Sequence, residues 1–305
     1  MNNFTTEGSR EKLRKFECIV LLFNGCFALF LSAVICLTNI VLIAATATNP
    51  HRLEKVIDKI HNAFCYINVM AGAMFLPYFG VAEILQALEI TTTTILFPSY
   101  LSSTLFFFAQ SNVQVPLFIL IERCTAFVSP HFNLRVMTKR KVLITLFLSE
   151  SFSLLFVCLS FAGINERVFY TIYIHVFFSA PMLFLLITTF VTYWKLKNRN
   201  RVVSNEIPQT VEQLELHKKR NVRTARKYLT IVTLFFVPIF LCMFPWYVVK
   251  VIEITHKNPS LTTDAGFFWQ RFSIPLLFVP GATGPITLTL RFEAYYNSVK
   301  RFIRR

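Results

Sequence analysis

The run ECIVLLFNGCFALFLSAVICLTNIVLIAATAT, from Glu17 to Thr48, decides the fold class of this chain. After Glu17 it contains no charged residue, and most of its positions are apolar. A helix of about 20 mostly apolar residues is long enough to cross a bilayer. The run therefore predicts a membrane-spanning helix near the start of the chain.

The rest of the chain has the same character. Over 305 residues the hydrophobic content is 54%, the mean hydropathy is +0.54 and only 15% of residues are charged. A water-soluble domain is usually far more polar. The 34 Phe residues are spread through long apolar stretches, unlike the alternating patterns of soluble strands and helices. We therefore expect an all-α membrane protein.

Seven segments are long and apolar enough to be spans. We predict a seven-transmembrane helix bundle over residues 17–290, between an extracellular segment at 1–16 and a short amphipathic helix in the cytoplasmic tail, 291–305. The seventh span contains three prolines and is expected to be kinked. The predicted spans are Glu17–Thr48, His61–Leu88, Phe97–Val128, Lys141–Gly163, Val168–Trp194, Lys227–Ile254 and Phe267–Leu290.

Lys and Arg bias between the connecting segments predicts the orientation. Residues 49–60, 129–141, 195–226 and 291–305 carry most of these cations, which places them in the cytoplasm and the N-terminus outside. The basic cluster at 10–15 locally argues the reverse. The one Asn-x-Ser/Thr sequon is Asn3-Phe4-Thr5, and it supports an outer N-terminus glycosylated at Asn3. The first helix is expected to act as an uncleaved insertion signal.

The net charge of +15 fits a membrane better than a nucleic acid. The cations collect in short segments between apolar runs, where they meet anionic lipid headgroups, so no nucleic-acid partner is predicted. The seven Cys residues show neither paired nor Cys/His spacing, so we expect no metal, no cofactor and no disulfide framework. No catalytic motif is found, so an enzyme is not predicted.

The pair Glu122 and Arg123 lies near the inner end of the predicted third helix. A charge is costly at the bilayer centre but much less so near its surface. One interpretation is an anchor, in which Arg123 extends to the headgroups. The other is a switch, in which an adjacent acid holds the arginine in one state and releases it toward a cytoplasmic partner in another.

Seven helices, an outer N-terminus and the sequence Glu122-Arg123-Cys124 resemble G-protein-coupled receptors, which have Asp or Glu, Arg and usually Tyr at this place. The chain length, the Phe-rich helices and the sequence ERCTA particularly resemble nematode serpentine chemoreceptors. The architectural likeness covers nearly the whole chain, whereas the motif is short. The resemblance implies a plasma-membrane receptor of sensory neurons that binds a small molecule and signals through a heterotrimeric G protein at the basic cytoplasmic loops.

The same resemblance extends to four other positions in the helices. Asn39 and Asn68 lie where such receptors carry polar residues in helices one and two. Pro245 and Pro285 match the prolines of helices six and seven. Both asparagines should point into the bundle because a polar side chain in the membrane needs a partner, and simple interhelical hydrogen bonding without a signalling role explains them equally well. With Glu122 and Arg123, these four form the predicted signalling switch.

Three features depart from the large rhodopsin-like class. Helix seven keeps only Pro285 of the usual Asn-Pro motif, and the usual outer disulfide is missing because no Cys lies near Phe97 or in 164–167. The inner end of helix six is entirely basic, so no acid there can pair with Arg123. These departures indicate a divergent receptor family.

The outer third of the bundle is the predicted ligand site, because kinked helices leave cavities there. Its amphipathic and polar residues outline an aromatic and cationic pocket that suits a small, partly apolar, acidic molecule. Each residue alone is more often structural than ligand-binding. The candidates are Gln110, Tyr173, His175, Trp246, Tyr247, Lys250 and Gln270, with Asn112, Trp269 and Arg271 nearby.

Two carboxylates lie within predicted spans. Glu150 should be protonated or hydrogen-bonded inside the bundle, and Glu83 could pair with Lys250 or Arg271. Such residues also suit a transporter or ligand-gated channel, which remains the alternative function. The chain shows no internal repeat and an odd number of spans, which argues against a transporter built from equal halves.

Overall fold

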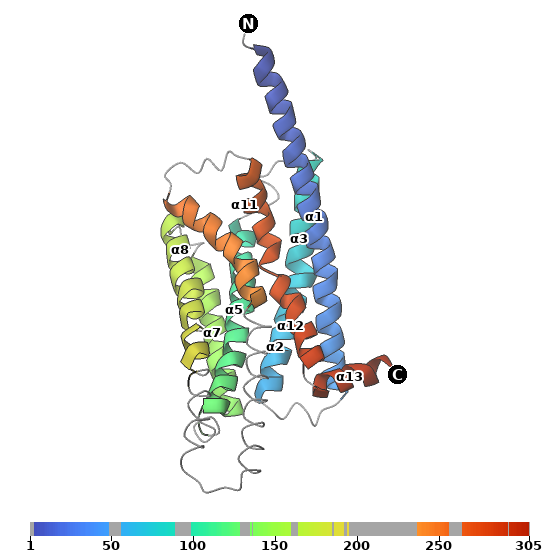
Figure 1. Cartoon of the computed structure of the whole chain (residues 1–305), viewed down its shortest axis with the longest axis vertical. Helices are drawn as coiled ribbons and strands as arrows, with labels where there is room; N and C mark the ends of the chain where they lie inside the picture. The colour runs from blue at the N-terminus through green and yellow to red at the C-terminus, as the bar shows by residue number, and fades with distance from the viewer. Residues whose placement is uncertain are drawn as a thin grey trace, which may run out of the picture.

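The computed structural model is a bundle of long helices (Figure 1). It describes residues 3–48, 56–88, 99–128, 135, 137–159, 164–184, 186–191, 194, 237–255, 264–291 and 293–304. Within these residues there are helices and turns but no strand. The all-α prediction is confirmed for this part of the chain.

The first half of the chain forms long helices with one π-helical interruption. α1 (Asn3–Ala47) begins well before the predicted span at Glu17. The second predicted span is a continuous rod of α2 (Val56–Met70), the π-helix η2 (Ala71–Phe75) and α3 (Leu76–Ala87). The next helices are α5 (Ser99–Val128) and α7 (Lys139–Leu159).

The second half is more interrupted. α8 (Glu166–Ile172) leads into the π-helix η4 (Tyr173–Ser179), within a helical stretch that extends to Val191. A helix at Val237–Thr255 follows, drawn in orange in Figure 1. The chain ends with α11 (Asp264–Leu276), α12 (Val279–Arg291) and α13 (Glu293–Ile303).

Among the described residues, five helices are long and apolar enough to cross a membrane. They correspond to the first, second, fourth, fifth and sixth predicted spans. For the third, α5 is one helix of 30 residues, although some of its side chains lie outside the described part. The five are Lys15–Ala47, Lys59–Ala87, Arg140–Leu159, Arg167–Val191 and Val237–Thr255.

The outward faces of these helices are strongly apolar. Large side chains such as Phe30, Leu37, Phe147 and Leu155 are all more than half exposed. A water-soluble protein rarely exposes apolar patches of this extent. Such a surface is compatible with a protein that lies in a membrane.

The seventh predicted span is broken into two short helices. α11 ends at Leu276 and α12 begins at Val279, with a turn at Leu277 and Phe278. Pro280 has no N–H to donate to the carbonyl of Leu276, so the α-helical hydrogen bond between residues four apart cannot form there. Hydrogen bonds between residues three apart form instead, from Phe278 N–H to the Pro275 carbonyl (3.0 Å) and from Gly281 N–H to the Phe278 carbonyl (2.9 Å). The expected kink is confirmed.

α1 and α3 approach each other closely at two glycines. A Cβ placed on Gly25 would lie 2.7 Å from the Gly80 carbonyl oxygen, and one on Gly80 would lie 2.8 Å from the Gly25 carbonyl oxygen. Only residues without a side chain allow two helix backbones to pack this tightly. Nearby, Ser32 Oγ donates a 2.6 Å hydrogen bond to the carbonyl of Gly72.

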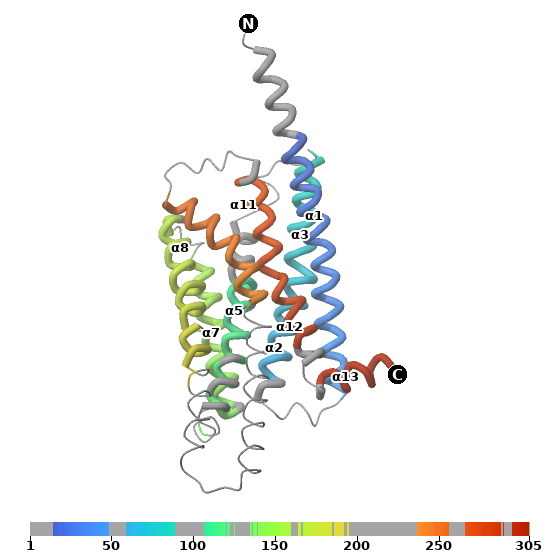
Figure 2. The backbone as a smooth tube through the Cα atoms, viewed as in Figure 1, coloured from blue at the N-terminus to red at the C-terminus, as the bar shows by residue number. Residues whose placement is uncertain are grey.

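The C-terminal helix packs near the bottom of the bundle in the view of Figure 1, opposite to the end of α3 and the start of α11. Figure 2 shows α13 running across the end of α1. Tyr295 and Val299 pack against Leu42 and Cys65, and His61 Nδ1 lies 3.1 Å from the Tyr295 hydroxyl. Tyr295 and Val299 therefore attach α13 to the bundle, while Phe302 is exposed.

Candidate functional site

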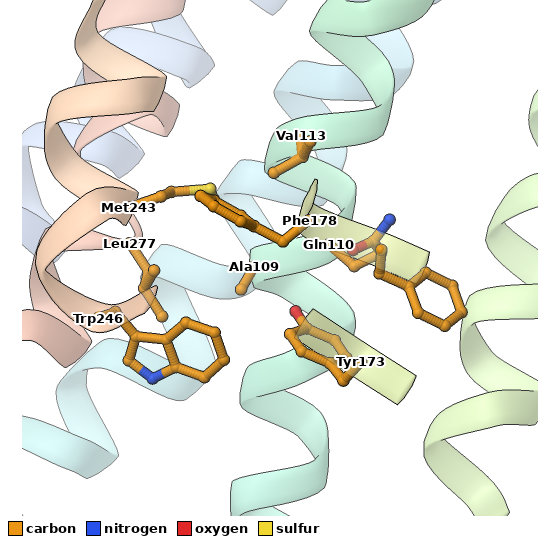
Figure 3. Close-up of a pocket in the computed structure, with 9 residues that line it drawn as sticks. Ala109, Gln110, Val113, Tyr173, Phe178, Met243, Trp246 and Leu277 are labelled. Carbon is orange, nitrogen blue, oxygen red and sulfur yellow. The ribbon is translucent and has the colours of Figure 1, made fainter. Parts of the chain in front are cut away.

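A small cavity lies between α5, η4, the helix Val237–Thr255 and the turn after α11 (Figure 3). Its volume is about 10 Å³, which is about enough for a single water molecule. Figure 3 shows Trp246 and Tyr173 facing the cavity from different helices, with Met243 beside Phe178. The lining residues are Ala109, Gln110, Val113, Tyr173, Phe177, Phe178, Met243, Trp246 and Leu277.

The π-helix η4 supplies the densest group of buried rings at this site. It buries Tyr173, Ile174, Phe177 and Phe178, and the rings of Tyr173 and Phe177 stack with their centroids 5.8 Å apart. Ser179 Oγ donates to the carbonyl of Ile174, five residues earlier, at 3.1 Å. A π-helical turn widens the helix and often marks a functional site.

Rings join η4 to the helix Val237–Thr255. Tyr173 meets Trp246 edge to face with ring centroids 5.7 Å apart, and Phe178 stacks on Tyr247 at 5.0 Å. Such pairs add roughly 0.5–1.5 kcal/mol beyond the burial of their surface. The cavity is therefore enclosed on two sides by aromatic side chains.

Gln110 is the polar amide of the lining. Its side chain is only 2% exposed, and within the described residues no partner lies within hydrogen-bonding distance of Nε2. A buried donor without a partner costs about 1–3 kcal/mol. This atom could therefore gain a hydrogen bond from any molecule that brings an acceptor into the cavity.

Polar side chains of the helix Val237–Thr255 and of α11 contact one another outside the cavity lining. Lys250 Nζ is 2.6 Å from Glu253 Oε2 and 4.5 Å from the ring centre of Tyr170. Gln270 Nε2 donates to Glu253 Oε1 at 3.1 Å. The ammonium group of Lys250 is thus already paired with a carboxylate and an aromatic face.

A second ion pair joins α11 to α3 and α1. Arg271 Nη1 donates to Glu83 Oε1 at 2.9 Å, and Asn24 Nδ2 donates to Glu83 Oε2 at 3.1 Å and to the carbonyl of Arg271 at 3.2 Å. Of the two partners predicted for Glu83, the structure selects Arg271. Sequence reasoning missed Asn24, although an amide within an apolar run was a usable signal.

The predicted ligand residues fall into four groups. Gln110, Tyr173 and Trp246 line the cavity, Tyr247 packs beside it on Phe178, and Lys250 and Gln270 meet at Glu253. His175 is exposed and is not brought to the cavity.

The expected cationic character of the pocket is not found in its lining. Among the residues that the structure describes, none of the nine that line the cavity carries a charge, and the predicted pocket cations Lys250 and Arg271 are paired with Glu253 and Glu83. The sequence indicated which helices carry cations but not which acids would pair with them. Met243 and Leu277 were missed because an apolar residue in a span carries no signal of its direction.

Three buried amides gather around Gly281 deeper in the bundle. Asn39 Nδ2 donates to the carbonyls of Ile35 (2.8 Å) and Gly281 (2.9 Å). A Cβ on Gly281 would lie 2.5 Å from Asn68 Oδ1 and 3.6 Å from Asn112 Oδ1. Asn39 and Asn68 therefore point into the bundle, as predicted.

A polar seam also connects α5 with α7. Ser111 Oγ donates to Glu150 Oε2 at 2.6 Å, which confirms the expectation that Glu150 is hydrogen-bonded in the bundle. One turn along, Ser149 Oγ donates to Gln114 Oε1 (2.9 Å) and Gln114 Nε2 donates to Ser153 Oγ (3.1 Å).

The remaining predicted positions are placed as follows. Glu122 is half-buried in the last two turns of α5, whereas the side chains of Arg123 and Asn3 lie outside the described residues. Pro245 lies inside the helix Val237–Thr255, and Pro285 is buried inside α12. Within the described part of the chain, no group of three or more His, Cys, Asp or Glu is arranged to hold a metal ion.

Comparison with known proteins adds no family assignment. No protein-family model matches the chain, and no curated protein matches it.

Proposed function

We propose that this chain is a seven-span membrane receptor of the nematode chemoreceptor kind. It binds a small molecule in the cavity beside Gln110 and passes the change to a G protein at its cytoplasmic loops. The observation that carries the proposal is the cavity itself. It lies where four elements meet, it is lined by adaptable apolar side chains, and it holds a buried amide nitrogen without a partner within the described residues.

Two further elements complete seven spans in this proposal. α5 would be the third span, and α11 followed by α12 would be the seventh. Both α11 and α12 contact α1, as expected for a span inside the bundle. α13 would lie along the inner leaflet, with Lys300 and Arg301 in its last turn toward the headgroups.

In this proposal the sixth span, which includes the helix Val237–Thr255, would connect the cavity with the cytoplasmic side. Met243 and Trp246 line the cavity on this helix, and Pro245 between them removes one backbone hydrogen bond, which makes bending easier. A ligand that displaced Met243 or Trp246 would shift this helix. In the sequence, the predicted sixth span Lys227–Ile254 follows the basic segment 195–226, where the G protein would bind.

Signalling in a reporter cell tests this proposal. The full chain would be expressed with a promiscuous G protein and screened with volatile and secreted small molecules, using calcium as the readout. We expect Arg123→Ala to abolish the response while surface expression persists. Lys300→Ala, a basic residue placed away from the switch, serves as the control. An unaltered response in Arg123→Ala would remove the arginine from the mechanism.

A ligand-gated channel or transporter is the second candidate, because Glu83 and Glu150 lie within predicted spans. Membrane topology separates the two. Glycosylation of Asn3, or protease access to residues 1–16 from outside the cell, favours the receptor. Access from the cytoplasm favours a channel of the insect chemoreceptor type.

A further inference from the structure

We propose that the cavity takes an uncharged, compact and mostly apolar molecule that presents one hydrogen-bond acceptor to Gln110. This inference rests on the proposed function, because it takes the cavity to be the ligand site. It revises the acidic ligand that the sequence suggests, and it follows from the lining, the paired charges nearby and the unpartnered amide.

The lining selects against charge. Its members are aromatic, aliphatic, thioether, amide and phenol side chains, and none is ionised at neutral pH. Moving an ion from water into such surroundings is very unfavourable unless an opposite charge or several hydrogen bonds receive it. An uncharged apolar molecule loses little hydration and gains contact with the rings of Phe177, Phe178 and Trp246.

The cations near the cavity are not available to an acidic ligand. Lys250 lies 2.6 Å from Glu253, and Arg271 lies 2.9 Å from Glu83, whose side chain is 2% exposed. An acid would have to displace one of these carboxylates from its cation, which is most costly at the buried Glu83. An amine would have to displace Lys250 or Arg271 from its carboxylate, so both anions and cations are disfavoured.

The hydrogen-bonding preference comes from Gln110. Its Nε2 can only donate, and it is buried without a partner within the described residues. A ketone, ester or ether oxygen in the cavity would satisfy it, whereas a hydrocarbon would leave it unsatisfied. Loss of one such neutral hydrogen bond corresponds to about a tenfold change in affinity.

Size is limited by the small free volume. The cavity of about 10 Å³ must widen to admit even one ring, so the lining has to move. Met243 is the side chain best suited to this, because an unbranched thioether changes rotamer easily. A single aromatic ring with a short substituent requires less widening than a larger molecule, so we expect a ligand of about this size.

Four probes that share one ring test these preferences. They are ethylbenzene, acetophenone, benzoate and benzylamine, which offer no acceptor, a neutral acceptor, an anion and a cation. The full chain in lipid nanodiscs would be heated with each probe, because a ligand that binds only the folded state raises the Tm. We expect acetophenone to raise the Tm at lower concentrations than ethylbenzene, and the two ions to have no effect.

Matched substitutions on α5 assign the preference to one residue. Gln110→Met removes an amide whose buried Nε2 has no partner within the described residues, so we expect a Tm without ligand that is no lower than that of the parent chain, and about tenfold weaker acetophenone binding. Gln114→Met, one turn away, breaks the hydrogen bonds to Ser149 and Ser153. It should lower the Tm yet leave the preference for acetophenone over ethylbenzene intact.

The outcomes separate this inference from the proposed function. If acetophenone binds through Gln110 but no G-protein response follows, the ligand class stands and the receptor proposal falls. Binding of benzoate or benzylamine as tight as that of acetophenone would overturn the ligand class. Equal acetophenone binding by Gln110→Met, or no binding of any of the four probes at millimolar concentration, would overturn it as well.

Discussion

Two contacts in this bundle are made in different ways. α1 packs against α3 and α11 through glycines and directional polar bonds, namely the Gly25–Gly80 approach and the network of Asn24, Glu83 and Arg271. η4 packs against the helix Val237–Thr255 through aromatic rings, such as Tyr173 on Trp246. The first contact fixes distance and rotation together, whereas rings can slide over one another at little cost.

The two contacts therefore differ in how much movement they permit between their helices. Close backbone approach and a buried ion pair each lose their energy when two helices shift slightly. Offset and edge-to-face rings keep most of theirs over a range of positions. The cavity lies on the aromatic side, so a ligand would move helices there while α1, α3 and α11 serve as the fixed reference.

Removing the buried carboxylate should have the largest effect. In Glu83→Leu, Arg271 loses its anion and Asn24 loses an acceptor, which we expect to cost about 3–5 kcal/mol. Thermal unfolding in nanodiscs measures this loss. Glu253→Leu is the comparison, because the Glu253 side chain is 18% exposed, against 2% for Glu83, and its partner Lys250 also contacts the Tyr170 ring. Lys250 and Gln270 lose a partner in this variant, but water reaches the site more easily, so we expect a smaller loss, below about 3 kcal/mol. Equal losses would show that Glu83 has no special structural role.

A single methyl group at the glycine contact should have the next largest effect. The Cβ of Gly25→Ala would meet the Gly80 carbonyl oxygen and Ile84 Cγ1, each at 2.7 Å, so α1 and α3 must separate. We expect a loss of about 1–3 kcal/mol, measured as a lower Tm. Cys26→Leu adds more atoms at the next, exposed position and should change the Tm little. A tolerated Gly25→Ala would show that this contact is not tight.

The aromatic contact should tolerate change best. Phe178→Leu removes the stack on Tyr247 but leaves an apolar side chain, so we expect a loss of about 1 kcal/mol. Phe184→Leu, at an exposed position of the same helical stretch, provides the reference for a ring that faces outward. Unfolding of Phe178→Leu at ambient temperature would contradict the idea that this side repacks easily.

Much of this arrangement could be predicted from the sequence, because a long apolar run has few other structures available. The helices, the inward direction of Asn39 and Asn68 and the hydrogen-bonded Glu150 follow from hydropathy and from the cost of burying polar groups. The kink near Pro280 follows from the missing N–H of proline. The seven spans and the G-protein partner remain predictions.

Other features depend on partners that are distant in the chain. Glu83 had two predicted cations within reach, and only the packing of α11 against α1 selects Arg271. Gly25 and Gly80 give no local signal that they face each other. The π-helical turns η2 and η4 were not predicted, and the side chain of His175, a predicted cavity residue within η4, is exposed.

The central claim is that the α1–α3 contact is fixed and the contact between η4 and the helix Val237–Thr255 is adaptable. Spin labels attached to unnatural amino acids at exposed positions test it directly. This labelling does not use cysteine, so the native cysteines stay in place. One pair would be placed at Phe30 and Tyr78, and the other at Val176 and Leu241. Pulsed electron resonance on the ligand-free protein in nanodiscs should give a narrow distance distribution for the first pair and a broader one for the second. A first pair as broad as the second would contradict the account.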